Sequence, residues 1–340
     1  MKSASKTIAL CALAGTMLAG PALADTSKMK IAFSNNYAGN SWRQAMLKSY
    51  DLVTKKAVAD GIVAAADVFT TADKEVPTQA AQIQNLILQG YNAIVINAGS
   101  PDALNGAVKQ ACDAGIVVVS FDGVVTEPCA WRIVVDFKEC GRQEVEHMAK
   151  LVPKGGNLLE IRGLAGTGID ASVHDGILEG VKAHPDFKIV SSVTGDWDQT
   201  TAQKAVATVL PSLPPIVGVV DQGGDAYGAA QAFAAAGRPR PEIMMGNRQD
   251  EFVYWKEQKD KDGYQSWSAS IAPGVSTLAF WVAQQILDGK KDIPHDLLVP
   301  YLEFTQDTFE SELPNIPKGG VASHEYTQAD AIAAIKANMK

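Results

Sequence analysis

The chain has 340 residues, of which 46% are hydrophobic and 20% are charged, and its formal net charge is −8 at pH 7. This length exceeds one usual hydrophobic core, so we expect two domains. The acidic balance and the lack of any Lys/Arg cluster in the sequence argue against nucleic acid and anionic membranes as partners.

Residues 1–24 have the pattern of a secretory signal peptide. A basic start with two lysines is followed by an apolar run over residues 8–18, and then by a small-x-small cleavage pattern that ends at Ala24. The apolar run is too short to span a bilayer. We therefore expect export to the periplasm with cleavage after Ala24.

The first predicted strand and helix carry a dense set of polar and aromatic side chains. The apolar run at residues 31–33 indicates a buried strand, and Asn40 or Ser41 can cap the helix that follows. The strand end and the first helical turn offer a flat ring, a guanidinium and amides, which suit a neutral polyhydroxylated molecule better than a phosphate or a metal. The candidate ligand-binding residues here are Asn36, Asn40, Trp42 and Arg43. An ordinary buried tryptophan on a capped surface helix would explain the same pattern.

Further strands alternate with helices up to residue 136. Apolar runs indicate strands at residues 63–69, 91–96, 116–121 and 133–135. This alternation indicates a parallel sheet with right-handed crossovers. Asn97 and Asp122 directly follow two of these strands, so they should meet Asn40 at the carboxyl edge of the sheet, where open α/β sheets bind ligands.

Three cysteines lie beyond the signal peptide, in what should be an oxidising compartment. Cys112 ends a predicted helix and Cys129 precedes the next strand, which places both at the face opposite the strand carboxyl ends. Cys140 follows that strand and should lie at the other face. We therefore favour a disulfide between Cys112 and Cys129, with Cys140 left over. No histidine makes a paired-ligand spacing with a cysteine, so no metal is expected.

The same alternation repeats in the second half of the chain. Predicted strands lie at residues 157–161, 188–193, 216–220 and 242–245. Trp197, Gln222, Asn247 and Arg248 follow strand ends. Asp170 lies in the first turn of a predicted helix and is also a candidate, although an acidic residue there needs no ligand to explain it. Two sheets that each present polar groups at their carboxyl edges predict a cleft between two domains.

Patterns for catalysis are weak. The glycine-rich segment 163–168 does not fit G-x-G-x-x-G, and no G-x-S-x-G nucleophile elbow occurs. Asp196 and Asp198 could suggest a glycosidase pair, but alternate residues of an extended segment point to opposite sides. We expect neither enzymatic activity nor a cofactor.

Taken in order, these motifs resemble the periplasmic sugar-binding proteins of ABC transporters, of the ribose- and galactose-binding type. The resemblance runs from about Lys28 to Gly289 and rests on residues 31–33, 40–43, 90–97, 120–122, 163–167, 195–198 and 287–289. It implies the type I periplasmic-binding-protein fold, an α/β architecture of two doubly wound parallel-sheet, Rossmann-like domains joined by a three-segment hinge.

The resemblance also implies domain boundaries. The N-terminal domain would comprise residues 28–136 and 271–298, and the C-terminal domain residues 137–270 and 299–340. Two of the hinge segments would lie near residues 268–271 and 298–303.

Carried over by position, the resemblance implies a set of ligand contacts. The matching positions are Asn40, Trp42, Arg43, Asn97, Asp122, Trp197 and Gln222. The chain departs from the family pattern where Val173 and Gly123 each replace an arginine, Arg248 replaces an aspartate and Ser270 replaces a glutamine. These exchanges rearrange the polar groups of the site.

The implied function is that of a periplasmic receptor for an ABC importer. It would hold a monosaccharide or polyol (a pentose, a hexose or a sugar alcohol) between its domains, close by a hinge motion, and deliver it to the permease and ATPase subunits in the membrane. Two arginines that face one or two carboxylates fit a sugar acid equally well. A receptor that signals to a sensor kinase or chemoreceptor would need the same cleft. We expect a monomer.

Overall fold

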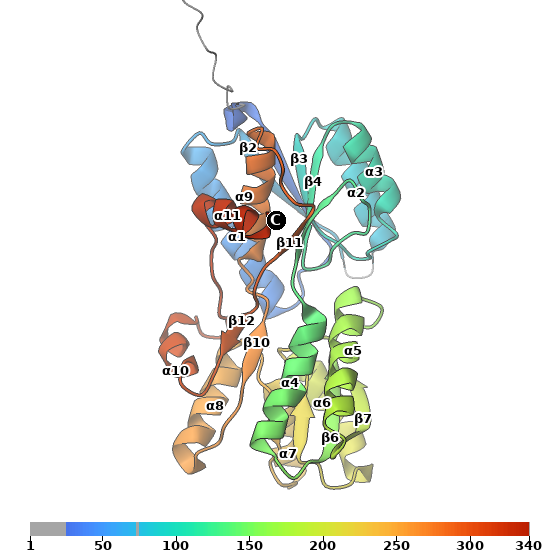
Figure 1. Ribbon diagram of the computed structural model, residues 1–340, viewed down its shortest axis with the longest axis vertical. Coiled ribbons are helices and arrows are strands. Elements are labelled where there is room, and N and C mark those ends of the chain that lie inside the picture. The colour runs from blue at the N-terminus through green and yellow to red at the C-terminus, as the bar shows by residue number, and fades with distance from the viewer. Residues whose placement is uncertain (1–24, 73–74, 340) are drawn as a thin grey trace, which may run out of the picture.

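The computed structural model describes residues 25–72 and 75–339. The predicted signal peptide and its cleavage site after Ala24 fall outside these residues. Two α/β lobes lie end to end along the longest axis (Figure 1). Within the described ranges, no helix has both the length and the apolar character that crossing a bilayer requires.

The first lobe is built on a six-stranded parallel sheet with strand order β11-β5-β4-β3-β1-β2. Its strands are β1 (Lys30–Asn35), β2 (Ala65–Thr70), β3 (Ala93–Asn97), β4 (Val117–Phe121), β5 (Trp131–Val134) and β11 (Asp296–Leu298). Every residue of β3 is buried. Such continuous burial is typical of parallel sheets, because helices cover both faces.

Alternate residues of each strand point to opposite faces of this sheet and meet different helices. Ile31 and Phe33 pack with α1 (Ser41–Ala59), α9 (Val275–Leu287) and α11 (Gln328–Asn338). Ala32 points the other way, toward α2 (Val76–Leu88) and α3 (Asn105–Asp113). A disulfide joins Cys112, in α3, to Cys129, the pair that the sequence favoured. Cys140 is a buried free thiol.

The second lobe repeats the architecture with a four-stranded parallel sheet in the order β7-β6-β8-β9. Its strands are β6 (Gly156–Arg162), β7 (Phe187–Thr194), β8 (Gly218–Val220) and β9 (Glu242–Ile243). Helices α4 (Phe137–Leu151) and α5 (Gly168–Ala183) cover one face, and α6 (Gln199–Val209), α7 (Ala226–Ala235) and α8 (Gln249–Asp262) cover the other. The second lobe also includes α10 (Phe309–Glu312) and the antiparallel pair β10 (Ser268–Ser270) and β12 (Leu302–Phe304). Short 3-10 helices occur at η1 (Thr26–Lys28), η2 (Leu210–Ser212) and η3 (Leu313–Asn315).

The chain passes between the lobes at residues 135–136, 271–274, 299–301 and 322–327. The first three passages correspond to the expected hinge segments. Sequence reasoning missed the last one, which leads from Val321, bridged to Arg248 in the second lobe, to α11. Figure 1 shows this segment rising from α10 to α11.

Helix α11 lies on the first lobe. Its residues Ala331 and Ile335 are fully buried in the cluster formed by β1, β3, α1 and α9. The sequence-based division placed all of residues 299–340 in the second domain, and this helix departs from it. We propose that the second domain ends near Ala322, which still donates its N–H to Asn247.

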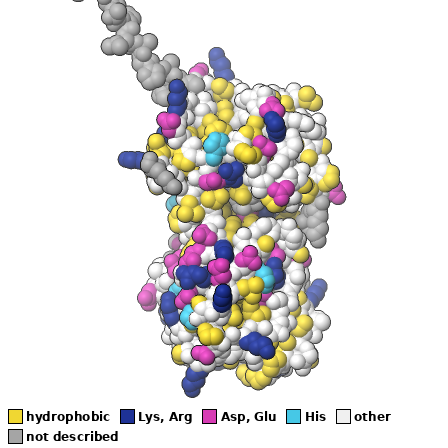
Figure 2. Space-filling view, turned by 45° about the vertical axis from the view of Figure 1, so that its right-hand side comes forward, with side chains coloured by type: hydrophobic (Ala, Val, Ile, Leu, Met, Phe, Trp, Pro, Cys, Tyr) yellow, Lys and Arg dark blue, Asp and Glu magenta, His cyan; other side chains and the backbone are white. Residues whose placement is uncertain are grey.

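The space-filling view shows a waist between the two lobes (Figure 2). On the described residues of the face shown, Lys and Arg side chains are interspersed with Asp and Glu side chains, most densely on the lower lobe. This face therefore presents mixed charge rather than a single-sign patch.

Candidate functional site

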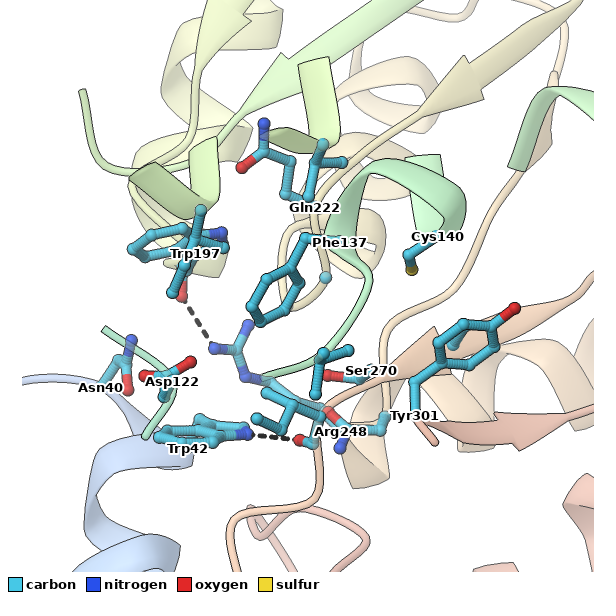
Figure 3. Close-up of a pocket in the computed structure, with 18 of the residues that line it drawn as sticks. Asn40, Trp42, Asp122, Phe137, Cys140, Trp197, Gln222, Arg248, Ser270 and Tyr301 are labelled. Carbon is cyan, nitrogen blue, oxygen red and sulfur yellow. Dashed lines mark hydrogen bonds between the residues drawn. The ribbon is translucent and has the colours of Figure 1, made fainter. Parts of the chain in front are cut away.

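A cavity lies at the waist, between the two lobes. Of the predicted ligand-binding residues, those that line it are Asn40, Trp42, Arg43, Asp122, Trp197, Gln222, Asn247, Arg248 and Ser270. Those that Figure 3 labels reach the cavity from both lobes, for example Trp42 from the first and Trp197 from the second.

Arg43 and Asp122 form a buried ion pair on the first-lobe wall. The Nη2 atom of Arg43 lies 3.2 Å from Oδ2 of Asp122, and the two side chains are 9% and 7% exposed. Asn97 Nδ2 donates to the same carboxylate oxygen over 2.9 Å. Burial has the largest effect on the pKa of Asp122 and raises it, while Arg43 and Asn97 act to lower it.

The N-terminus of α1 fixes the two residues beside this pair. The side-chain oxygen of Asn40 caps the helix by accepting the N–H of Arg43 over 2.8 Å. The indole N–H of Trp42 donates to the carbonyl of Ile271, in a passage between the lobes. The guanidinium carbon of Arg43 lies 5.3 Å from the Trp42 ring centre, within the range of a cation–π contact.

Arg248 connects the two lobes across the cavity. Its Nη2 atom donates to the carbonyl of Trp197, and its Nε atom donates to Ser41 Oγ at the start of α1, each over 2.7 Å. Its remaining nitrogen, Nη1, is buried and has no hydrogen-bond partner within the described part of the chain. Arg248 thus keeps hydrogen-bonding capacity that the described residues leave unused.

Two glycines make room for the second-lobe residues. A Cβ atom added at Gly163 would overlap the indole of Trp197, and one added at Gly224 would overlap the guanidinium of Arg248. Gly224 also has a φ of +85°, a conformation that other residues rarely adopt. These positions explain how a large ring and a long cation fit against neighbouring loops of the second lobe.

A cluster of buried carboxyl groups lies behind Arg248. Burial raises the pKa of Asp221 and Asp225 well above its usual range, and the nearby Arg248 charge opposes this increase. Burial also raises the pKa of Glu251, which accepts the backbone N–H of Arg248. Arg248 therefore lies beside a cluster of acidic groups whose protonated form burial favours.

The three other predicted residues lie outside this cavity. Asn97 is buried behind Asp122. Asp170 is buried and forms a two-point contact with Arg162, whose Nε donates to Oδ1 over 2.8 Å and whose Nη2 donates to Oδ2 over 2.6 Å. Its carboxylate also accepts an N–H of Gln222. Asn36 lines an adjoining cavity, which shares Arg43, Asp122 and Trp197 with the first. Asn97 and Asp170 thus hold lining residues in place.

Sequence reasoning missed the apolar part of the wall. The lining residues that were not predicted include Val135, Phe137, Cys140, Ile169, Val173 and Tyr301, together with the acidic Glu144. Phe137 immediately follows a passage between the lobes and Tyr301 is the last residue of another, and these positions could have singled them out. Among the described residues, no group of three or more His, Cys, Asp or Glu side chains is arranged to hold a metal ion.

Comparison with known proteins places this geometry among solute-binding proteins. A family described as "Periplasmic binding protein domain" matches residues 31–291. The xylitol-binding protein of Mycolicibacterium smegmatis is 31% identical over 174 residues, which is 50% of this chain and 50% of that relative. The ribose import binding protein of Salmonella typhimurium is 26% identical over 86% of this chain and 94% of its own. The crystal structure of an ABC transporter solute binding protein from Thermobispora bispora superimposes with a TM-score of 0.85 at 32% identity, covering 91% of this chain and 95% of that one.

Proposed function

Because this chain belongs to the periplasmic binding protein domain family, we propose that it is a periplasmic receptor for a monosaccharide or polyol. The ligand binds between the lobes and is delivered unchanged to the permease and ATPase of an ABC importer. Relatives that share this domain are named for binding xylitol and for importing ribose, both small polyhydroxylated molecules.

The observation that carries the proposal is the position of Arg248. This side chain contacts Ser41 of the first lobe and Trp197 of the second, and it keeps one buried N–H donor without a protein partner. A hydroxyl oxygen can accept that N–H and at the same time donate to a carboxylate such as Asp122. A molecule rich in hydroxyl groups would therefore stabilise the contact between the lobes.

The aromatic residues fit the apolar faces of such a molecule. Figure 3 places the rings of Trp197 and Trp42 on opposite sides, with Asp122 between them. Burying part of a large apolar side chain against a sugar C–H face contributes up to roughly 1.5–3 kcal/mol. Polar groups would then orient the ligand while the rings contribute to its affinity.

The charges favour a neutral ligand over a sugar acid. Arg43 is paired with Asp122, and Arg248 faces Asp221, Asp225 and Glu251. A ligand carboxylate would have to displace Asp122 from Arg43 or add one more acidic group beside the buried cluster at Arg248, which is costly in a buried site.

A thermal-shift screen tests the proposal directly. The purified protein is heated with pentoses, pentitols, hexoses and the corresponding sugar acids. A ligand that binds only the folded state raises Tm by mass action. We expect a neutral sugar or polyol to raise Tm by several degrees and the matching acid to have little effect; no response to any neutral compound would overturn the proposal.

Arg248→Lys tests the residue that carries the argument. Lysine keeps the positive charge beside the buried carboxyl groups but lacks the planar fork that makes several directed bonds. We expect calorimetry to show at least about tenfold weaker binding, while Arg240→Lys, on the second lobe away from the cavity lining, leaves the affinity unchanged. Equal binding by both variants would remove Arg248 from the site.

Delivery to a permease is tested by uptake in the source cell. A strain that lacks the chain should fail to accumulate the radiolabelled ligand and recover when the gene is restored. Normal uptake combined with a lost transcriptional or chemotactic response would instead identify a sensory receptor.

A further inference from the structure

One side of the cavity is apolar, and we call it the hinge-side wall. It consists of Val135, Phe137, Cys140, Val173, Ile271 and Tyr301. Val135, Ile271 and Tyr301 come from three of the passages between the lobes. Figure 3 shows Cys140 and Tyr301 on the side of the cavity away from Asn40, Asp122 and Trp42, with Phe137 between the two groups.

The hinge-side wall offers few hydrogen bonds to a ligand. Val135, Val173 and Ile271 have no polar side-chain atom, and the thiol of Cys140 is only a weak donor. The hydroxyl group of Tyr301 points away from Arg248 and Trp42 in Figure 3. Glu144, which also lines the cavity, accepts the backbone N–H of Asp221 through Oε2.

Close backbone contact between two helices holds this wall together. A Cβ atom at Gly141 in α4 would overlap the carbonyl of Val173 in α5, so the helices meet with no side chain between their backbones at this point. Cys140 and Val173, which are 7% and 4% exposed, therefore belong to one well-packed surface. Such a surface has little freedom to turn a polar group toward a ligand.

We propose that the ligand carries an apolar terminal group, a methyl or deoxy carbon, that packs against the hinge-side wall. The hydroxylated part of the same molecule meets Arg43, Asp122 and Arg248. The preferred class is therefore a terminal-deoxy sugar or a deoxy polyol. This inference rests on the proposed function and narrows its ligand class.

The presence or absence of one terminal hydroxyl group on the ligand determines which of two related molecules binds more tightly. A terminal hydroxyl placed against the hinge-side wall would lose its water without gaining a partner, whereas a methyl group there gains apolar contact. Differences of this size between two ligands in an apolar pocket are worth roughly 10- to 200-fold in affinity. The effect is large enough to measure by calorimetry.

The test compares matched pairs of ligands with the purified protein. Each pair has a parent and its terminal-deoxy analogue: xylitol with 1-deoxyxylitol, D-ribose with 5-deoxy-D-ribose, and D-galactose with D-fucose. In the pairs that bind, we expect the deoxy member to bind about tenfold more tightly. The opposite order, with the parent tighter, overturns this inference and leaves the proposed function intact; no binding by any member overturns both.

Val173→Thr gives the complementary measurement. This change replaces a methyl group by a hydroxyl at nearly constant volume, so it offers the wall one hydrogen-bonding group. We expect the deoxy preference to shrink severalfold or reverse. Val181→Thr makes the same exchange two turns further along α5, outside the cavity lining, and should leave the preference unchanged. An unchanged preference in Val173→Thr would overturn the assignment of this wall.

Discussion

The ion pair between Arg43 and Asp122 links binding to stability at a single residue. Both side chains are at least nine-tenths buried, and the carboxylate also accepts an N–H of Asn97. Asp122→Ala would leave a buried guanidinium without its partner, which typically costs about 3–5 kcal/mol. We expect urea unfolding to show a loss of at least 2–3 kcal/mol in the free energy of unfolding, together with weaker ligand binding.

A double variant separates these two effects. Arg43→Met combined with Asp122→Leu removes both charges, so no buried charge is left unpaired, and most of the stability should return. Ligand affinity should remain low because the polar contacts are gone. Recovery of affinity along with stability would show that the pair supports the fold and does not contact the ligand.

Gly163 supports the ring of Trp197, and a single methyl group tests this role. A Cβ atom at this position overlaps the indole, so Gly163→Ala should displace the ring and weaken ligand binding about tenfold or more. Gly168→Ala is the matched control because a Cβ atom there meets nothing within 4 Å. Similar affinities for the two variants would show that the position of Trp197 does not matter for binding.

At the residue scale, the sequence predicted the polar groups of the cavity better than the apolar ones. Asn40, Asp122, Gln222 and Arg248 follow strand ends, where topology brings side chains together. Asn97 also lies at a strand end, but its side chain is fully buried and does not line the cavity. Phe137 and Val173 look like ordinary core residues in the sequence, so only the packing of α4 on α5 shows that they face a cavity.

At the element scale, two isoleucines of α11 test whether this helix packs on the first lobe. Ile335 is fully buried against the first lobe, whereas Ile332, on the same helix, is 40% exposed. Ile335→Ala should lower the free energy of unfolding by about 2–5 kcal/mol, because it leaves a cavity in the core. Ile332→Ala should change it by less than about 0.5 kcal/mol. Equal effects would show that α11 does not pack as described.

The placement of α11 also shows what local patterns leave undetermined. Its sequence has only two large apolar residues among alanines, so the pattern does not identify a partner surface. The contacts that fix it come from residues far away in the chain, such as the Trp281 indole N–H, which donates to the carbonyl of Tyr326 just before the helix. The sequence also predicted a strand over residues 242–245, but β9 covers only Glu242–Ile243. Met245 instead forms a bridge with Ser268, a contact that local patterns do not predict.

At the scale of the whole molecule, the repeat of strand and helix predicted two parallel sheets and a cleft between them. That prediction depends only on element order, because parallel strands place their carboxyl ends at one edge. The passage at residues 322–327 could not be predicted in the same way. It has no periodicity, and contacts such as Gly274 N–H to Ser323 Oγ join segments that are distant in sequence.

The buried carboxyl groups of the second lobe predict how the stability of the protein depends on pH. Burial raises the pKa of Glu144, Asp221, Asp225 and Glu251, so each binds a proton more readily in the folded protein than in the unfolded chain. For such groups the free energy of unfolding falls as pH rises from the unfolded pKa to the folded one. We expect urea unfolding to show greater stability near pH 5 than near pH 8.

Two other groups set the limits of this trend. Burial lowers the pKa of His147, so this residue makes the folded protein more stable as pH rises through the usual histidine pKa. It is a single group, and the four buried carboxyl groups act in the opposite direction. Hydrogen bonds from Arg142 lower the pKa of Glu139 to about 2, so stability is lost again as pH falls below the usual carboxyl range.

Asp225→Asn removes one titrating carboxyl group while keeping its shape, and should flatten the rise in stability between pH 8 and pH 5. A stability that increases with pH over this range, equally in both proteins, would contradict the assignment, because ionised carboxylates would then be the favoured form in the folded lobe.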